Sequence, residues 1–327
     1  MVQLEPGPSL AQALFELNAG RAIGLPTETV YGLAADGTRP TAVAEIFRIK
    51  GRPPAHPLIL HLAEASWLDQ YCINVPPLAW HLAESLWPGP LTLVLERSSK
   101  VPDCVTGGLS TVAVRVPSHP VALSVLRAFA RPLAAPSANR FGAVSPTTAQ
   151  HVVDDLGEDV AVVLDGGACE CGVESTIVEV REGQAKILRP GGITRETLEA
   201  MGVEVASGDL RASPRVPGSL ESHYCPRARV QVVQDEDLEG AAHRAKGHGL
   251  KVGIVTQRSL RQSTDAEILQ LGTSPEDLAR GVYAAFRELD RRECAVIFLS
   301  LPTSDGLGAA VADRIRRAAT RVNDGSD

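Results

Sequence analysis

Long apolar runs are missing from this chain of 327 residues. No stretch approaches the roughly 18 consecutive apolar residues that a transmembrane helix needs. The first residues, MVQLEPGPSLAQAL, combine neither a basic start nor a continuous apolar run, so we expect no signal peptide. These absences predict a cytoplasmic protein without a membrane anchor.

Cysteine is scarce and scattered, with six residues in the whole chain. Only Cys169 and Cys171 lie close together, and their C-x-C spacing lacks the repeated C-x-x-C units of a structural zinc site. Disulfide frameworks are typical of small secreted domains rather than of a large chain with an ample core. We therefore expect reduced thiols, no protein-held metal and no cysteine nucleophile.

The common signatures of nucleotide binding and hydrolysis are also missing. The chain contains no G-x-x-x-x-G-K-[ST], no G-x-G-x-x-G, no G-x-S-x-G and no H-E-x-x-H. A net charge of −7 argues against a protein whose whole surface binds nucleic acid. A local basic pocket is compatible with that charge.

Composition divides the chain into two α/β parts joined by a linker. Residues 1–205 form the first predicted domain. Residues 206–228 are rich in Ser, Pro, Gly and Arg and have no hydrophobic period, which is typical of a linker. In residues 229–327 strand-like and helix-like segments alternate, and this order predicts a small, mostly parallel, doubly wound domain.

Residues 26–61 hold the densest group of polar side chains at the ends of predicted elements. A polar turn follows a strand-like run, a cationic turn follows a helical run, and a histidine ends the next apolar strand. The side chains at these ends are Thr27, Glu28, Thr29, Tyr31, Lys50, Arg52 and His61. Sites are commonly built on such ends, so the stretch predicts a pocket for a small anion.

Further polar residues are dispersed along the first domain. Arg115 lies in the apolar strand 111–116 on the same face as Thr111, a position that favours an anionic partner. Ser137, Ser145 and Arg189 occupy element ends. Guanidinium, ammonium and hydroxyl groups suit phosphate and carboxylate oxygens, and Mg²⁺ could bridge the phosphates of a bound triphosphate. Taken singly, each residue is a weak signal, and a single arginine of this kind more often forms a surface salt bridge or a cap.

Seven ordered blocks combine these signals into a family resemblance. They are PTETVYGLAAD, IFRIKGRPPAHPLILH, WPGPLTLVL, TVAVRVPSHP, PSANRFGAVSPT, GVESTIVEV and ILRPGGIT. Over about residues 10–200 the chain resembles the threonylcarbamoyl-AMP synthase family, and its linker and tail resemble the long, two-domain branch. The resemblance implies an α/β fold in which a YrdC-like domain with a twisted open sheet precedes a small Rossmann-like domain.

The resemblance also implies a nucleotidyltransferase reaction and its site. L-threonine, bicarbonate and ATP with Mg²⁺ would give L-threonylcarbamoyl-AMP and pyrophosphate, and the product would pass to the machinery that modifies tRNA with N6-threonylcarbamoyladenosine. The residues implied for L-threonine are Thr29, His61, Arg115, Ala135 and Ser175. Those implied for ATP are Lys50, Arg52, His56, Thr111, Ser137, Ser145, Arg189 and Tyr224.

Two positions depart from the family pattern. His56 stands where Asn is common. The family linker commonly reads PGMKYRHYAP, whereas this chain has PGSLESHYCP, with Leu220 and Ser222 in place of basic residues. We still expect the linker to act as a lid over the site. No residue is predicted to be a covalent nucleophile.

Other functions stay open at this stage. The same cationic concave face could bind RNA, and a weak tRNA contact is compatible with the chain. YrdC-like domains also occur in hydrogenase-maturation carbamoyltransferases, but this chain lacks their acylphosphatase and zinc-finger segments. The C-terminal domain could sense a ligand or provide a docking surface, and the sequence does not give the oligomeric state.

Overall fold

The computed structural model describes residues 3–5, 9–181, 183–206, 215–218, 222–260 and 265–320. By their internal contacts the residues form two units. One consists of Met1–Phe141 and Pro146–Ser219, and the other of Gly142–Ser145 and Leu220–Asp327. Within the described ranges, no helix combines the length and the apolar character needed to cross a bilayer.

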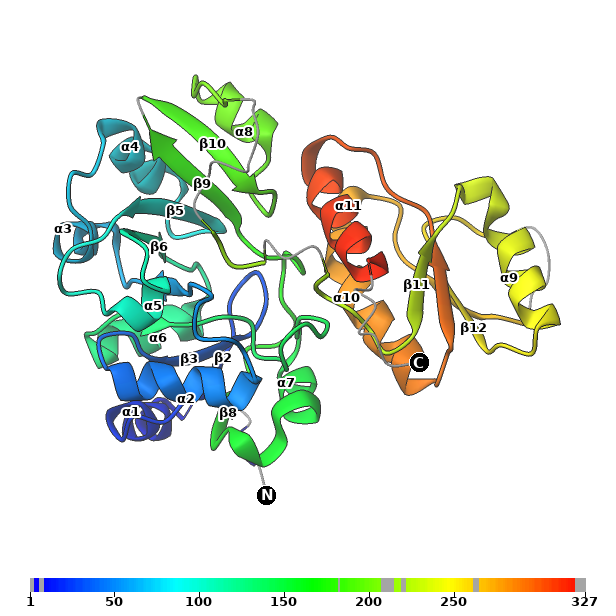
Figure 1. The fold of residues 1–327 in the computed structure, drawn as a ribbon, viewed down its shortest axis with the longest axis horizontal. Coiled ribbons are helices and arrows are strands. Elements are labelled where there is room, and N and C mark those ends of the chain that lie inside the picture. Colours follow the sequence, from blue (N-terminus) through cyan, green and yellow to red (C-terminus); the bar gives the residue numbers. More distant parts are fainter. Residues whose placement is uncertain are drawn as a thin grey trace. The chain divides into compact units, whose positions relative to one another are not determined.

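A ten-stranded mixed sheet forms the centre of the N-terminal unit (Figure 1). Its spatial order is β1-β8-β2-β3-β7-β4-β6-β5-β9-β10. The strands are β1 (Gln3–Glu5), β2 (Ile23–Leu25), β3 (Gly32–Asp36), β4 (Ile59–His61), β5 (Leu91–Glu96), β6 (Thr111–Arg115), β7 (Leu133–Ala134), β8 (Val162–Leu164), β9 (Thr176–Arg181) and β10 (Gln184–Arg189). β4 and β6 run parallel, as do β5 and β9, so the middle of the sheet mixes both directions.

Helices pack on both faces of this sheet. They are α1 (Leu10–Asn18), α2 (Pro40–Lys50), α3 (Leu68–Tyr71), α4 (Pro77–Leu86), α5 (Asp103–Thr106), α6 (Pro120–Phe129), α7 (Ala149–Leu156) and α8 (Arg195–Ala200). Apolar residues of α1 and α6 form one core with β2, β3, β7 and β8. The other face carries the larger core, to which α2, α4, α7 and α8 contribute.

The sheet face on which α1 and α6 pack continues across β4, β6, β5, β9 and β10. We call this continuation the open face, and the smaller apolar cluster on it the open-face cluster. Its members are Ile59, Val94, Ala113, Ile177, Leu188 and Val216. Five of them come from strands, and Val216 comes from the segment that was predicted to be a linker. Because side chains alternate along a strand, His61, Thr92 and Arg115 lie on the same face as this cluster. This face therefore carries several of the predicted site residues.

The C-terminal unit contains a four-stranded parallel sheet with the order β11-β14-β12-β13. Its strands are β11 (Arg229–Val232), β12 (Val252–Thr256), β13 (Glu267–Gln270) and β14 (Val296–Leu299), and its helices are α9 (Leu238–Gly247), α10 (Pro275–Arg291) and α11 (Gly306–Ala319). Helix α9 packs on one face through its own apolar core. On the other face, Gly253 lets Leu289 of α10 approach closely, because an added Cβ would lie 2.8 Å from that side chain. This is the predicted doubly wound arrangement.

Candidate functional site

The turn after β2 is a hydrogen-bonded loop built on Thr27. Its Oγ1 accepts hydrogen bonds from the amides of Thr29 and Val30 and lies 2.6 Å from the carbonyl of Val30. The hydroxyls of Thr27 and Thr29 are 2.9 Å apart, and both residues are buried. The amide of Tyr31 donates to the carbonyl of Pro146, which joins the turn to a distant segment of the same unit. The PTETVY motif thus forms a buried turn that is held by its own hydrogen bonds.

Arg115, at the end of β6, brings this turn and the sheet together. Its Nη1 donates to Oγ1 of Thr29 at 2.9 Å, and its Nε donates to the carbonyl of Gly89 at 3.1 Å. Its Nη2 forms an ion pair with Oε1 of Glu28 at 2.6 Å. Burial raises the pKa of Glu28, but the charge and hydrogen bond of Arg115, together with backbone hydrogen bonds from Glu28 and Ser118, leave the pKa lowered. Arg115 is therefore a buried cation whose charge is balanced by a carboxylate.

His61 lies opposite Arg115 in the pairing of β4 with β6. It is buried, and Nδ1 has no hydrogen-bond partner among the described residues. Burial, assisted by the charge of Arg115, lowers the pKa of His61 to about 3. The imidazole is therefore uncharged at neutral pH, and it can exchange hydrogen bonds with a ligand without adding a charge.

Ser175, just before β9, connects the sheet with Arg189 at the end of β10. Its hydroxyl lies 2.8 Å from that of Thr92 on β5. Nη2 of Arg189 donates to the carbonyl of Ser175 at 2.8 Å and to its hydroxyl at 3.2 Å, while Nη1 donates to the carbonyl of Pro217 at 3.0 Å. Ser175 and Arg189, predicted for different substrates, are thus in direct contact.

Lys50 ends α2 and orders the PSAN segment. Its Nζ donates to the carbonyls of Ser137 at 2.5 Å and Asn139 at 2.6 Å. Burial first and the neighbouring Arg52 second lower the pKa of Lys50 well below its usual value. In the same segment, the amide of Ala135 donates to the carbonyl of Ile59. In this structure Lys50 holds the backbone that carries Ser137.

Arg52 and His56 lie around the ring of Phe141. The guanidinium carbon of Arg52 is 5.8 Å from the ring centroid, and the His56 ring meets Phe141 edge-on with centroids 5.5 Å apart. Nη2 of Arg52 also donates to the carbonyl of Pro57 at 2.9 Å. Burial and the charges of Arg52 and Arg215 lower the pKa of His56. Arg52, His56 and Phe141 thus form a positively charged surface with one aromatic ring.

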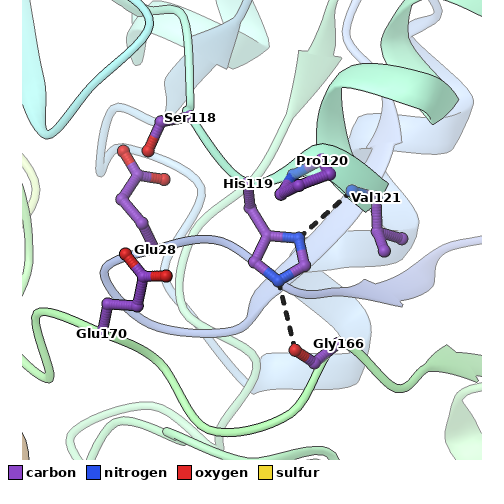
Figure 2. Close-up of a pocket in the computed structure, with 7 residues that line it drawn as sticks. All are labelled: Glu28, Ser118, His119, Pro120, Val121, Gly166 and Glu170. Atoms are coloured by element: carbon purple, nitrogen blue, oxygen red, sulfur yellow. Dashed lines mark hydrogen bonds between the residues drawn. The ribbon is translucent and has the colours of Figure 1, made fainter.

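Two cavities border this set of residues. One, of about 280 Å³, is lined by Thr111 at the start of β6 together with Glu96 and Glu179. The other, of about 330 Å³, lies beside Glu28. Figure 2 shows Glu28 and Glu170 on one side of this second cavity and the ring of His119 on the other. None of the residues predicted to bind L-threonine or ATP lines the second cavity, but Glu28 does, and its ion pair connects this cavity to Arg115.

Two predicted residues, Ser145 and Tyr224, belong by their contacts to the C-terminal unit. The ring of Tyr224 stacks on Tyr283 with centroids 5.7 Å apart, and the guanidinium carbon of Arg314 lies 5.2 Å from its centroid. Tyr224 also adopts a left-handed backbone with φ of 63°. Two linker residues differ from the family pattern. Ser222 is among the described residues, and Leu220 lies outside them.

Sequence reasoning did not assign a role to Glu28 or to Thr92, although both side chains contact predicted site residues. For each residue the sequence contained a feature that could have indicated a role in the site. Glu28 is flanked by Thr27 and Thr29 in a turn that was expected to hold an anion, and Thr92 is a hydroxyl inside the apolar run LTLVL. None of the six cysteines, all of which lie in the described residues, forms a disulfide bond.

Comparison with known proteins decides the family. The Sua5/YciO/YrdC family model, described as telomere recombination, matches residues 16–191, and the model of the threonylcarbamoyl-AMP synthase C-terminal domain matches residues 193–320. The chain belongs to the threonylcarbamoyl-AMP synthase family. It is therefore an enzyme of the nucleotidyltransferase type, which confirms the predicted family and enzyme class.

Individual relatives support this assignment over nearly the whole chain. The threonylcarbamoyl-AMP synthase of Pyrococcus abyssi is 39% identical over 92% of this chain and 91% of its own length. That of Bacillus subtilis is 36% identical over 95% of this chain and 93% of its own length. The crystal structure of P. abyssi Sua5 complexed with L-threonine matches with a TM-score of 0.87 and 38% identity, covering 95% of this chain and 94% of that one. The two-domain fold class is thereby confirmed.

Proposed function

We propose that this protein converts L-threonine, bicarbonate and ATP into L-threonylcarbamoyl-AMP and pyrophosphate for the modification of tRNA. The observation that carries the proposal is the buried guanidinium of Arg115, which contacts both Thr29 and Glu28 on the open face of the sheet. A guanidinium of this kind matches the carboxylate of an amino acid. His61, Ala135 and Ser175 would complete the L-threonine site, and the P. abyssi relative binds this amino acid.

The nucleotide would lie against the cations at the end of α2 and at Arg189. Arg52, His56 and Thr111 would contact ATP directly, and Lys50 would act partly through the backbone of Ser137 and Asn139. Ser145 and Tyr224 stay predictions from the family resemblance.

Mg²⁺ would enter with ATP rather than as a resident metal. Among the described residues, no group of three or more His, Cys, Asp or Glu side chains could hold a metal ion. The cationic side chains instead suit the phosphates that would carry Mg²⁺. When bound, Mg²⁺ would neutralise phosphate charge, and Lys50 and Arg52 would add to that effect.

The reaction depends on how the protein positions the substrates, and it does not need a nucleophilic side chain. The uncharged threonine amine attacks CO₂ and loses a proton to give a carbamate, or attacks bicarbonate and releases water to give the same carbamate. A carbamate oxygen then attacks the α-phosphorus, and pyrophosphate leaves. The protein would hold the reactants in line, neutralise charge and exclude water. Such a reaction, followed by transfer to tRNA, fits a cytoplasmic enzyme.

The linker is proposed to cover the site. In support, the carbonyl of Pro217 accepts a hydrogen bond from Arg189, and Val216 is buried in the open-face cluster. A related structure is a variant of P. abyssi Sua5 in which an adjacent His and Tyr are replaced by Ala, and it matches with a TM-score of 0.88 and 38% identity over 95% of this chain. This chain has His223 and Tyr224 in its linker. The proposal keeps the predicted limits of the catalytic domain at residues 1–205, of the linker at 206–228 and of the C-terminal domain at 229–327.

Pyrophosphate release from ATP, with L-threonine and bicarbonate present, tests the function. We expect the wild type to be active, and Arg52→Ala and Arg115→Ala to lose activity while keeping their fold. Arg291→Ala is a matched control, because that side chain is 75% exposed and pairs with Glu288. If either site variant kept near-normal turnover, the site would be wrong. Calorimetry with tRNA in place of ATP and L-threonine separates this function from an RNA-binding module.

A further inference from the structure

Thr92 is a fully buried hydroxyl in an otherwise apolar strand segment. β5 reads LTLVLE, and Thr92 has no exposed surface. Valine fits a buried strand position of this shape equally well, and it avoids the free-energy cost of removing a hydroxyl from water. That cost is offset here by the contact of 2.8 Å between the hydroxyls of Thr92 and Ser175.

Strand pairing places both hydroxyls on the open face. β5 runs parallel to β9, with Thr92 opposite Ile177. Ser175 precedes Ile177 by two residues, so its side chain extends to the same side, and Ile177 belongs to the open-face cluster. The pair thus lies on the face that carries Arg115.

The directions of these hydrogen bonds follow partly from Arg189, which can only donate. Its Nη2 lies 3.2 Å from the hydroxyl oxygen of Ser175, so Ser175 accepts there. A serine hydroxyl has two lone pairs and one proton. If Thr92 also donates to Ser175, both lone pairs are occupied, and the Ser175 proton must point toward a third group. Thr92 therefore controls whether Ser175 can donate to a ligand.

We propose that Thr92 is a positioning residue that fixes the hydroxyl of Ser175 as a hydrogen-bond donor to an oxygen of bound L-threonine. The inference rests on the proposed function, in which Ser175 contacts the amino acid. Nε and Nη2 of Arg189 both donate to the carbonyl of Ser175, whereas the hydroxyl of Thr92 contacts the hydroxyl of Ser175. Loss of the Thr92 hydroxyl should therefore affect the amino acid more than the nucleotide.

The test uses the full-length enzyme with Thr92→Val, which keeps the shape and removes the hydroxyl. One net hydrogen bond corresponds to roughly a two- to tenfold change in affinity. We expect Kd for L-threonine by calorimetry, and its KM, to rise about three- to tenfold, with KM for ATP changed less than about twofold on the same scale. Thr92→Ser should restore the wild-type values. Thr256→Val, at a buried strand position of the C-terminal unit, is the matched control.

A double substitution checks that Thr92 acts through Ser175. In a Ser175→Ala background, Thr92→Val should not weaken L-threonine binding further. If Thr92→Val does not fold, Thr92→Cys, a weaker donor of similar size, takes its place. An unchanged Kd for L-threonine would overturn the inference, and so would equal rises of both KM values that Thr92→Ser fails to reverse. Failure of the wild type to release pyrophosphate would overturn the proposed function itself.

Discussion

The carboxylate of Glu28 lies 2.6 Å from the guanidinium of Arg115, and the two side chains are only 5% and 4% exposed. Removing one partner of a buried ion pair leaves the other charge uncompensated, at a cost of about 3–5 kcal/mol. The carboxylate of a bound amino acid could supply the missing negative charge. The pair therefore links the stability of the fold to substrate binding.

Glu28→Gln should lower the free energy of unfolding, and L-threonine should restore more stability to this variant than to the wild type. Thermal unfolding with and without saturating L-threonine measures both effects. Glu84→Gln, at an exposed position of α4, serves as the control and should behave as the wild type. Equal shifts of Tm by L-threonine in variant and wild type would show that the amino-acid carboxylate does not reach Arg115.

His61 should make the stability of the protein depend on pH. Its pKa in the folded state is about 3, below the usual 6.5, so the unfolded chain binds a proton that the folded chain does not. Stability is therefore full above pH 6.5 and falls as the pH decreases from 6.5 toward 3. Between pH 7 and 5.5 the loss from this group is about 1 kcal/mol.

His61→Gln should flatten this part of the pH profile, measured as the free energy of unfolding in urea at pH 7 and 5.5. His81→Gln, at an exposed position on α4, should leave the profile as in the wild type. A profile that is equally steep with and without His61 would assign the pH dependence to another group.

The sequence pattern predicted most polar residues of the site, but it could not predict which of them contact one another. Hydrophobic alternation predicted β6 and placed Arg115 on the face of Thr111, because side-chain direction in a strand has a fixed period. The contact of Arg115 with Thr29 joins residues 86 positions apart, and a local pattern cannot supply such a pairing. Strand β3, Gly32–Asp36, was not expected, because its segment GLAAD is rich in small residues rather than β-branched ones.

Lys50 was expected to hold phosphates, and the structure adds a backbone role. Lys50→Met should leave the carbonyls of Ser137 and Asn139 without their buried donor, at a cost of about 1–3 kcal/mol for each. We expect a lower free energy of unfolding in urea and a higher KM for ATP. Lys100→Met, at an exposed position, is the control. A rise in KM for ATP with unchanged stability would indicate a direct phosphate contact alone.

Arg287 of α10 holds the loop that contains Ser145, a residue predicted to bind ATP. Its guanidinium donates to the carbonyls of Val144 and Ser145, and the amide of Cys225 donates to the carbonyl of Gly142. These contacts lie within the C-terminal unit, although the residues before and after the loop belong to the N-terminal unit. The backbone around Ser145 is therefore positioned by the C-terminal unit.

Arg287→Ala should raise KM for ATP roughly ten- to a hundredfold, because a hydrogen bond from a charged donor contributes about 1.5–3 kcal/mol. Kd for L-threonine should not change, since the residues predicted for the amino acid all lie in the N-terminal unit. Steady-state kinetics and calorimetry on the full chain measure the two values, with Arg291→Ala on the same helix as the control. An unchanged KM for ATP in an active enzyme would mean that nucleotide binding does not depend on the contacts of Arg287 with this loop. The function of the C-terminal unit would then lie elsewhere than in positioning Ser145.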